Sequence, residues 1–301
     1  MGLKYFICPD NKKILIQDCL QTGGCRLNNR CASLRTLQLV GHDRKWRLSP
    51  SCAGNGPRYE YLKATVDYAI TPESMMFAIL GTGAHAKLHQ FDDNVLSEQP
   101  LKDKEMTGTS DALQIDEYNP GKYILVDEKT WGSFKVAKAL GIVKEEETVL
   151  DKDGKPVLLK SGKRIGQPKT HKVYRIDPTK IDMRETELQL NRYRIFWEQL
   201  GYPISKMLIE AIVRDGGTAS AYACKIDKRL YLIPVKRLNN DEVLGYYRKL
   251  NDEVVEAFRT GYARKCNNWE SWDGKRCNSF CDVKEQCVEM SKKKGERWGI
   301  L

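Results

Sequence analysis

Eight of the ten cysteines fall into two groups of four near opposite ends of the chain. The two groups are Cys8, Cys19, Cys25 and Cys31, and Cys266, Cys277, Cys281 and Cys287. In a protein that stays inside the cell, cysteines bunched in fours are more often metal ligands than disulfide partners. We therefore expect both ends of the chain to fold around metal, with disulfides or unliganded thiols as the alternatives.

The kind of metal stays open at both groups. Four thiolates suit either Zn²⁺ or an iron–sulfur cluster such as [4Fe-4S]. Neither group contains the Cys-x-x-Cys knuckle that is typical of zinc ribbons. The remaining cysteines, Cys52 and Cys224, stand apart, and Cys224 lies in an apolar stretch where a small core residue is expected.

The charge of the chain points to a polyanionic partner. Lys and Arg number 50 against 40 Asp and Glu, so the net charge is +10. A positive surface attracts nucleic acid and releases its counterions on binding. The N-terminal residues lack the apolar stretch of a signal peptide, and no apolar run is long enough to span a membrane. We expect a cytoplasmic protein that does not contact membranes.

The region between the cysteine groups alternates helical and strand patterns. Helices are predicted at 57–70, 71 to about 91, 184–200 and 241–258. Strands are predicted at 108–115, 122–129, 206–213 and 222–235. This order predicts an α/β fold with a central mixed sheet flanked by helices and with cysteine-rich ends.

Changes in composition predict three modules. Residues 1–48 form a cysteine-rich N-terminal module, 49–260 a core, and 261–301 a basic, cysteine-rich C-terminal module. Within the core, the segment 143–172 is rich in Lys, Asp and Gly and reads as an exposed insertion. A hairpin turn is expected at 151–155.

Two of the predicted strands carry a group of charged residues. Asp111 lies in the first strand, and Asp127, Glu128 and Lys129 end the second. Side chains alternate along a strand, so Asp127 and Lys129 share one face while Glu128 points away. Pairing of the strands around the turn at 119–121 would bring Asp111 towards Asp127 and Lys129.

Two carboxylates and a lysine are the groups that hydrolysis of a phosphodiester requires. Carboxylates hold Mg²⁺ or Mn²⁺, and the ion polarises the phosphate and lowers the pKa of a bound water. A lysine orients that water or stabilises the developing negative charge. Taken alone, however, an Asp-x-Lys sequence is more simply explained by a salt bridge at a strand end.

Two further motifs flank this group. Gly81 and His85 form a Gly-x-x-x-His sequence before it, and Gln189 and Tyr193 lie four residues apart on one helix face after it. In chain order, Gly-x-x-x-His, Gly-x-x-Asp, Asp-x-Lys-Thr and Gln-x-x-x-Tyr resemble the RecB-type exonuclease branch of the PD-(D/E)XK nuclease superfamily. The resemblance extends from about residue 49 to the C-terminus and includes iron–sulfur members of that branch, among them phage and prophage forms.

The resemblance implies a restriction-endonuclease-like core and assigns roles to individual residues. The implied metal ligands are His85, Asp111, Asp127 and the carbonyl of Glu128. Lys129 is implied to be the catalytic lysine. Gln189 and Tyr193 are implied to position the DNA strand or the groups of the active site.

The cysteines depart from the pattern of the iron–sulfur members. Those proteins take their fourth cysteine ligand from an upstream Cys-Pro-Arg segment, whereas here Gly56 precedes Pro57 and Arg58. Cys52 and Cys266 are the alternatives for the fourth ligand, and Cys266 is closer to the other three in sequence. A self-contained C-terminal group of four is the simplest assignment.

Together these features predict a deoxyribonuclease dependent on Mg²⁺ or Mn²⁺, an exonuclease acting on DNA ends or single strands. The alternative is a non-catalytic nucleic-acid-binding or recruitment protein with a degenerate nuclease core. No phosphate-binding loop of the helicase type occurs in the sequence. A helicase or another recombination or replication protein is therefore expected as a partner besides DNA.

Overall fold

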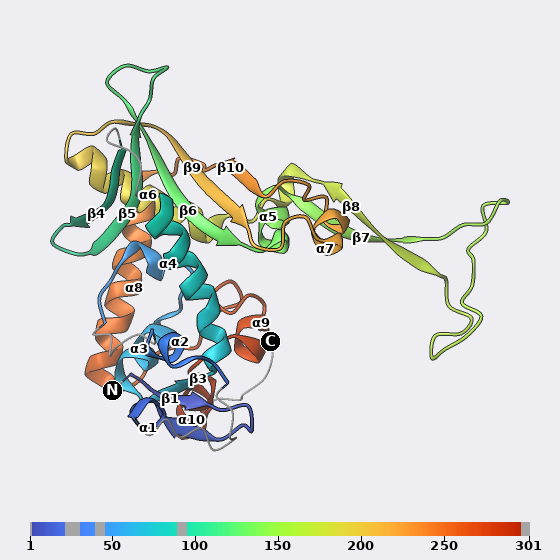
Figure 1. The fold of residues 1–301 in the computed structure, drawn as a ribbon, viewed down its shortest axis with the longest axis horizontal. Helices are drawn as coiled ribbons and strands as arrows, with labels where there is room; N and C mark the ends of the chain where they lie inside the picture. Colours follow the sequence, from blue (N-terminus) through green and yellow to red (C-terminus); the bar gives the residue numbers. More distant parts are fainter. Residues whose placement is uncertain (1, 22–30, 40–45, 89–94, 296–301) are drawn as a thin grey trace. The chain divides into compact units, whose positions relative to one another are not determined.

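The computed structural model of the protein describes residues 2–21, 31–39, 46–88 and 95–295. The fold is α/β, with mixed sheets flanked by helices (Figure 1). The chain divides into two compact units. The first unit comprises Met1–Leu125, Glu185–Met207 and Lys236–Leu301, and the second comprises Val126–Arg184 and Leu208–Val235.

The strands and helices follow each other in mixed order along the chain. The strands are β1 (Leu3–Ile7), β2 (Lys13–Leu15), β3 (Tyr68–Ile70), β4 (Val95–Lys102), β5 (Thr107–Ile115), β6 (Tyr123–Trp131), β7 (Ile142–Thr148), β8 (Thr170–Ile176), β9 (Ile204–Val213) and β10 (Leu230–Pro234). The α-helices are α1 (Ile16–Gln21), α2 (Leu34–Gln38), α3 (Pro57–Thr65), α4 (Met76–Leu88), α5 (Ser133–Ala139), α6 (Arg184–Gln199), α7 (Ala219–Ala223), α8 (Asn240–Thr260), α9 (Lys275–Ser279) and α10 (Lys284–Lys293).

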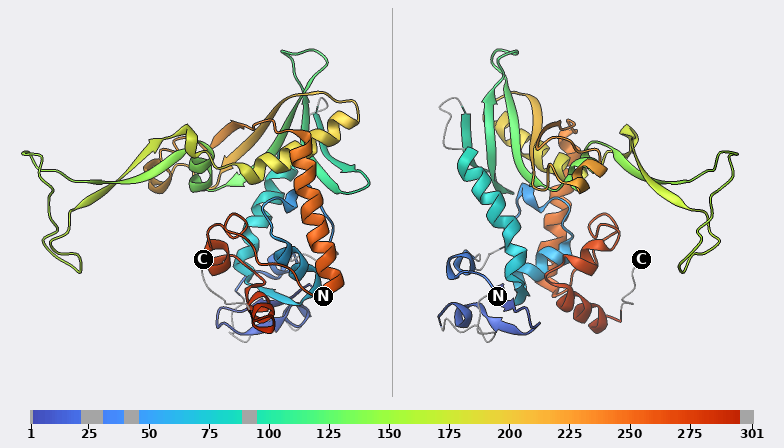
Figure 2. Two further views of the ribbon diagram at one scale, coloured as in Figure 1. Left: turned by 180° about the vertical axis from the view of Figure 1, so that it is seen from behind. Right: turned by 45° about the vertical axis from the view of Figure 1, so that its right-hand side comes forward.

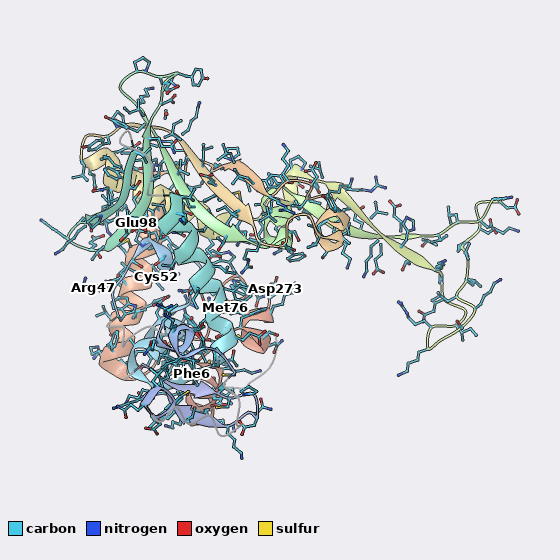
Figure 3. All side chains as sticks on the ribbon, viewed as in Figure 1. Phe6, Arg47, Cys52, Met76, Glu98 and Asp273 are labelled. Atoms are coloured by element: carbon cyan, nitrogen blue, oxygen red, sulfur yellow. The ribbon has the colours of Figure 1, made fainter. Side chains whose placement is uncertain are left out.

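A three-stranded sheet of order β2-β1-β3 lies in the first unit. Strand β1 pairs antiparallel with β2 and parallel with β3, so the N-terminal segment shares a sheet with residues 68–70. Phe6 of β1, labelled in Figure 3, is buried. It packs against Leu37 of α2 and Met75. Partly buried Cys19 packs against the same apolar cluster.

A five-stranded sheet has the order β10-β9-β6-β5-β4. Strands β5 and β6 are joined by a tight turn, in which the Asp116 amide donates to the Lys122 carbonyl at 2.9 Å. Gly121 in this turn has a φ of 78°, a conformation that glycine adopts at no steric cost. The predicted hairpin around 119–121 is therefore confirmed.

Helix α6 forms much of the core of the first unit. Ten of its residues are buried, including Asn191, Arg192 and Arg194. Arg192 is paired with Asp103, and Arg194 donates to Glu198. A helix that is buried on most of its surface must satisfy each of its polar groups internally, because water cannot reach them.

Asn191 joins this helix to the segment before α8. Its side-chain amide donates to the carbonyls of Glu187 and Lys236 at 2.9 and 2.8 Å. Its Oδ1 accepts from the Leu238 amide at 2.9 Å and from Arg194 Nε at 3.1 Å. Because the side chain of Asn191 is 0% exposed, no water can replace these bonds.

The second unit contains α5, α7 and the antiparallel pair β7–β8. The start of α5 is fixed by Asp215, whose carboxylate accepts from the Ser133 amide and the Ser133 hydroxyl, both at 2.6 Å. These bonds satisfy an amide at the helix start that has no partner within the helix. Beyond α5 and α7, β7 and β8 extend away from the rest of this unit (Figure 2).

Several predicted boundaries are wrong. The helix predicted at 57–70 ends at Thr65, and the β-branched Thr65 and Val66 lead into β3 instead. The strand predicted at 222–235 is limited to Leu230–Pro234. Its first part belongs to α7, an alanine-rich helix capped by Thr218, so Cys224 ends a helix although it is buried as expected.

Strand β4 was not predicted at all. It pairs with β5 along its length, from Val95 opposite Gln114 to Lys102 opposite Thr107. Its side chains alternate between partly buried and exposed but include few β-branched residues, so its own sequence gives a weak strand signal. The end of the helix predicted to reach about residue 91 lies outside the described residues.

We predict that Asn191→Ala lowers the free energy of unfolding by about 3 kcal/mol, because it leaves buried donors and acceptors without partners. Chemical denaturation measures this change. Gln199→Ala on the exposed end of the same helix is the control, with an expected change of about 0.5 kcal/mol or less. Equal destabilisation by the two substitutions would contradict the role assigned to Asn191.

Candidate active site and cysteine cavity

In the first unit, His85 and Asp111 face each other. His85 lies in α4 and Asp111 in β5, and their atoms Nδ1 and Oδ2 are 4.0 Å apart. Their side chains are 23% and 16% exposed, so both are accessible but largely surrounded by protein. The separation is too long for a hydrogen bond. Two ligands at about 2.1 Å from one ion lie at most about 4.2 Å apart, so the pair is spaced suitably for a shared ion.

Glycine in the Gly-x-x-Asp motif allows α6 to lie close to β5. A Cβ atom on Gly108 would lie 2.8 Å from Pro50 Cδ and 2.9 Å from Tyr193 Cε1. Two positions along β5, Ser110 Oγ lies 3.1 Å from Trp197 Nε1, which donates to it. Helix α6 therefore packs against the strand that carries Asp111, and it holds buried Tyr193 there.

Gln189 lies on the same helix, one turn before Tyr193, and is half-buried. The packing of Tyr193 on Gly108 is a contact that the sequence did not predict. The signal available in the sequence was the small residue itself, because a glycine inside a strand often marks a place where another group approaches the backbone closely.

In the second unit, Asp127, Glu128 and Lys129 occupy the second half of β6. Lys129 Nζ lies 2.6 Å from Asp127 Oδ2, as expected for residues that share one face of a strand. The Asp127 side chain is 2% exposed, whereas that of Lys129 is 26% exposed. A buried carboxylate needs a cation beside it, and Lys129 fulfils this need while its ammonium group stays accessible.

Glu128 is buried as well, although alternation directs it to the opposite face. Strand β6 lies in the middle of the five-stranded sheet, and a central strand is commonly covered on both faces. In the described part of the chain, no three His, Cys, Asp or Glu side chains are grouped so as to hold one metal ion. The ligand set of His85, Asp111, Asp127 and the Glu128 carbonyl therefore stays a prediction.

The C-terminal cysteines line one cavity in the first unit. Its volume is about 100 Å³. The four sulfur-bearing residues of its wall are Cys266, Cys277, Cys281 and Cys287. Helix α3 adds Arg58, Tyr59 and Leu62 to the wall. None of these four cysteines forms a disulfide, so the alternative of disulfides within this group is not realised.

Cys266 occupies the space beside position 56. A Cβ atom built on Gly56 would lie only 2.6 Å from Cys266 Sγ and 2.8 Å from Glu270 Oε2. Cys52, labelled in Figure 3, is not part of the cavity wall. Its sulfur lies 3.5 Å from the Ser49 hydroxyl. Of the two alternatives for a fourth sulfur, the structure places Cys266 at the cavity.

Partial burial favours the neutral form of three of these thiols. Desolvation raises the pKa of Cys266 to about 12 and also raises the pKa values of Cys281 and Cys287. At Cys287 the Arg58 guanidinium opposes this effect, since Nη1 lies 3.9 Å from the sulfur. Metal binding needs thiolates, so an ion entering this cavity must displace protons.

Arg58 is a residue of this region that sequence reasoning missed as a functional candidate. Its side chain is 1% exposed and donates to the Ala263 carbonyl and the Ser291 hydroxyl, both at 2.8 Å. The guanidinium thereby joins α3 to the chain on both sides of the cysteine group. The only signal in the sequence was its position directly after Pro57, within the segment that resembles Cys-Pro-Arg.

The N-terminal cysteine group is described in part. Cys8 follows β1, Cys19 lies in α1 and Cys31 is exposed. Cys25 lies outside the described residues. The predicted metal site of this group therefore stays a prediction.

The aromatic residues of the C-terminal module mainly pack against their neighbours. Trp269 makes an edge contact with Tyr246, with ring centroids 6.0 Å apart. Trp272 lies 5.9 Å from Phe280 and is 43% exposed. Trp269 is therefore held against Tyr246, whereas part of Trp272 is accessible.

No protein-family model matches this sequence, and the chain has no match among curated proteins. None of the described helices combines the length and the apolar character needed to cross a membrane. The chemistry of the candidate sites is therefore inferred from their own residues.

We predict that Gly108→Ala destabilises the protein by about 1–3 kcal/mol, because the added methyl group collides with Pro50 and Tyr193. Gly83→Ala in α4 is the matched control, since nothing lies within 4 Å of its added Cβ. This control should stabilise the helix by about 0.5–1 kcal/mol. Thermal unfolding of both variants tests the prediction, and a Gly108→Ala variant as stable as the wild type would refute it.

Proposed function

We propose that this protein is a deoxyribonuclease dependent on Mg²⁺ or Mn²⁺, with a core of the PD-(D/E)XK type. The observation that carries the proposal is the pairing of His85 with Asp111 at 4.0 Å on α4 and β5. A buried Asp127 bound to Lys129 on β6, the neighbouring strand of the sheet, supports it further. A salt bridge alone would explain Asp127 and Lys129, but it would not explain a histidine placed opposite Asp111.

The geometry of the hairpin turn supports a shared role for the two acids. Asp116 and Lys122 are bonded across the turn between β5 and β6. Strands β5 and β6 are neighbours in the five-stranded sheet, and each carries one of the two acids. We propose that Asp111 and Asp127 contribute to one metal site.

Each residue then has a distinct task in phosphodiester hydrolysis. His85, Asp111, Asp127 and the Glu128 carbonyl hold the ion, which polarises the phosphate and lowers the pKa of a water when it is bound. Lys129 is held by Asp127 and uses its exposed ammonium group to orient that water or to stabilise the negative charge that develops. Tyr193, fixed against Gly108, and Gln189 position the DNA strand.

The best alternative is a protein that binds nucleic acid without cutting it. A net charge of +10 favours DNA binding under either hypothesis. The presence of a complete set of acids together with the lysine favours catalysis. Under either hypothesis, a helicase or another recombination or replication protein would supply the unwinding that this chain has no phosphate-binding loop to perform.

We predict that Lys129→Ala and Asp111→Asn each reduce DNA cleavage by about 10²–10³-fold, the usual cost of removing one group that stabilises transition-state charge. Release of labelled nucleotides in the presence of Mg²⁺ or Mn²⁺ measures the rate. Lys122→Ala, at the exposed turn of the same hairpin, is the control and should cleave like the wild type. If all three variants degrade DNA at the wild-type rate, the nuclease assignment is wrong.

The same assay separates the modes of cleavage. An exonuclease degrades a linear strand and leaves a circular strand of the same sequence intact. Degradation of both substrates would identify an endonuclease instead. Binding of both without degradation by the wild type, with either metal ion, would favour the non-catalytic alternative.

We further propose that the cavity lined by the C-terminal cysteines holds either Zn²⁺ or a [4Fe-4S] cluster. The proposal is supported by the four cysteines that line one cavity and by Arg58, which favours the negative charge of Cys287. In the described structure the four sulfurs are not grouped closely enough to hold one ion, so binding would have to draw them together. A bound metal would hold the four sulfurs as thiolates and join α3 to the C-terminal segment, which is a structural contribution.

We predict that Cys266→Ser loses the metal of this cavity and that Cys52→Ser retains it, because Cys266 lines the cavity and Cys52 does not. Metal analysis and the visible absorption of anaerobically purified protein provide the measurement. Absorption in the visible range identifies an iron–sulfur cluster, whereas colourless protein containing zinc identifies the other metal. Loss of metal from Cys52→Ser but not from Cys266→Ser would overturn the assignment of the fourth ligand.

A further inference from the structure

The second unit carries a two-stranded arm, residues 142–176, that ends in two turns. Strands β7 and β8 pair without interruption from Ile142 opposite Ile176 to Thr148 opposite Thr170. At about 3.3 Å per residue, this ribbon is roughly 23 Å long. Beyond it the chain separates into two loops, which all three views of the ribbon show (Figures 1 and 2).

The end of the arm has a defined backbone structure. The Val149 amide donates to the Lys169 carbonyl at 2.8 Å. The Val157 amide donates to the Val149 carbonyl at 2.8 Å, and the Lys169 amide donates to the Val157 carbonyl at 2.7 Å. The first loop closes at Asp151, whose Oδ1 accepts from the amides of Asp153 and Lys155 at 2.9 Å. The second loop closes between Leu159 and Gln167 at 2.9 Å.

Positive charge is concentrated at this end. The segment 149–172 contains seven Lys or Arg residues and two Asp. The seven cations are all exposed and are Lys152, Lys155, Lys160, Lys163, Arg164, Lys169 and Lys172. Within the part of the chain that the structure describes, none of the seven takes part in an ion pair.

The three glutamates of the arm, Glu145, Glu146 and Glu147, lie in β7 and interact with residues of β8. Arg175 pairs with Glu147 and lies 3.3 Å from Glu145, and His171 lies 3.8 Å from Glu147. The Glu146 carboxylate accepts from the Thr170 hydroxyl at 3.4 Å. The glutamates of the ribbon are thus matched by residues of β8, whereas segment 149–172 carries seven cations against two Asp, an excess of positive charge that suits an anionic partner.

The composition of the end indicates which kind of nucleic acid fits. Segment 149–172 contains no Phe, Trp or Tyr. Proteins that bind single strands without sequence preference stack bases on aromatic side chains, and this end has none to offer. A two-stranded β-ribbon fits the major groove of duplex DNA, and lysines alone suffice to contact the phosphates beside it.

We propose that the end of this arm binds the sugar-phosphate backbone of duplex DNA, outside the nuclease site. The contact deepens the proposed nuclease function and rests on it: the arm holds the duplex that adjoins the end or single strand being cut. It supplies affinity that does not depend on base sequence and takes no part in the chemistry. Asp127 and Lys129 belong to the same unit as the arm.

Exposed apolar residues at the end raise the question of a lipid surface. Leu150, Leu158 and Ile165 are 57%, 51% and 66% exposed. Segments that bind at a membrane interface usually include Trp or Tyr, which are missing here. Duplex DNA is therefore the favoured partner, and a vesicle of anionic lipid serves as a competing probe.

The test replaces five of the cations by glutamine: Lys152, Lys155, Lys160, Lys163 and Arg164. Binding to a labelled blunt duplex is followed by fluorescence anisotropy in buffer without divalent ions, so that no cleavage occurs. We expect affinity at low salt to fall by about tenfold or more. The plot of log affinity against log salt concentration should become less steep by up to about 4.5, since each of the five lost phosphate contacts contributes about 0.9.

A control variant carries the same change in net charge elsewhere. It replaces five exposed lysines outside the arm by glutamine: Lys12, Lys102, Lys104, Lys236 and Lys249. We expect this variant to lose less than about twofold in affinity at the same salt. Equal loss in both variants would show that only net charge matters, and wild-type binding by the arm variant would exclude the arm; either result overturns the proposal.

Two more measurements distinguish this proposal from lipid binding and from the nuclease proposal. Affinity for vesicles containing phosphatidylserine that falls in the arm variant, with duplex binding unchanged, would assign the arm to lipid and overturn the proposal. Cleavage of a short single strand should be unchanged in the arm variant. If the protein cuts this strand but the arm variant binds duplex as well as the wild type, the nuclease proposal stands and the arm proposal fails. If duplex binding depends on the arm but no cleavage occurs, only the nuclease proposal fails.

Discussion

The burial of α6 is the constraint on which the rest of the first unit depends. This helix takes two arginines and an asparagine into a core where water cannot solvate them, so each must be met by a fixed partner. Asn191 meets the backbone before α8, and Arg192 meets Asp103. Fixed in this way, α6 presents Tyr193 to Gly108 and Trp197 to Ser110. The position of the strand that bears Asp111 thus depends on how polar groups are satisfied in the same part of α6, within two turns of Tyr193 and Trp197.

The two candidate sites differ in how they accommodate ionisable groups that are shielded from water. Asp127 is buried with a cation from its own strand, so its charge is balanced before any ion or substrate arrives. The C-terminal cysteines are partly buried, and desolvation favours the neutral form of Cys266, Cys281 and Cys287, with Arg58 opposing this effect at Cys287. The first arrangement suits a metal ion that comes and goes with substrate. The second suits a group that enters once and then stays, because its removal would return protons to the sulfurs that held it.

Local signals in the sequence were sufficient for the hairpin and the long helices. The Asn-Pro-Gly turn fixed the pairing of β5 with β6, and periodicity located α6 and α8 closely. Alternation also placed Asp127 and Lys129 together. Features that depend on distant residues were missed or misjudged. Strand β4 forms because it pairs with β5. Position 108 must be glycine because Tyr193 leaves no room for a Cβ atom there. Arg58 is buried by residues more than two hundred positions away.

That last separation has a consequence for how the chain folds during its synthesis. The partners of the Arg58 guanidinium, Ala263 and Ser291, are synthesised more than two hundred residues after it. Until they emerge from the ribosome, the Arg58 side chain lacks these two native hydrogen-bond partners. Contacts of such high sequence separation form late and carry a large loop-closure entropy. The cysteine cavity, to which Arg58 and Cys287 both contribute, therefore cannot close before the chain has been synthesised beyond these residues.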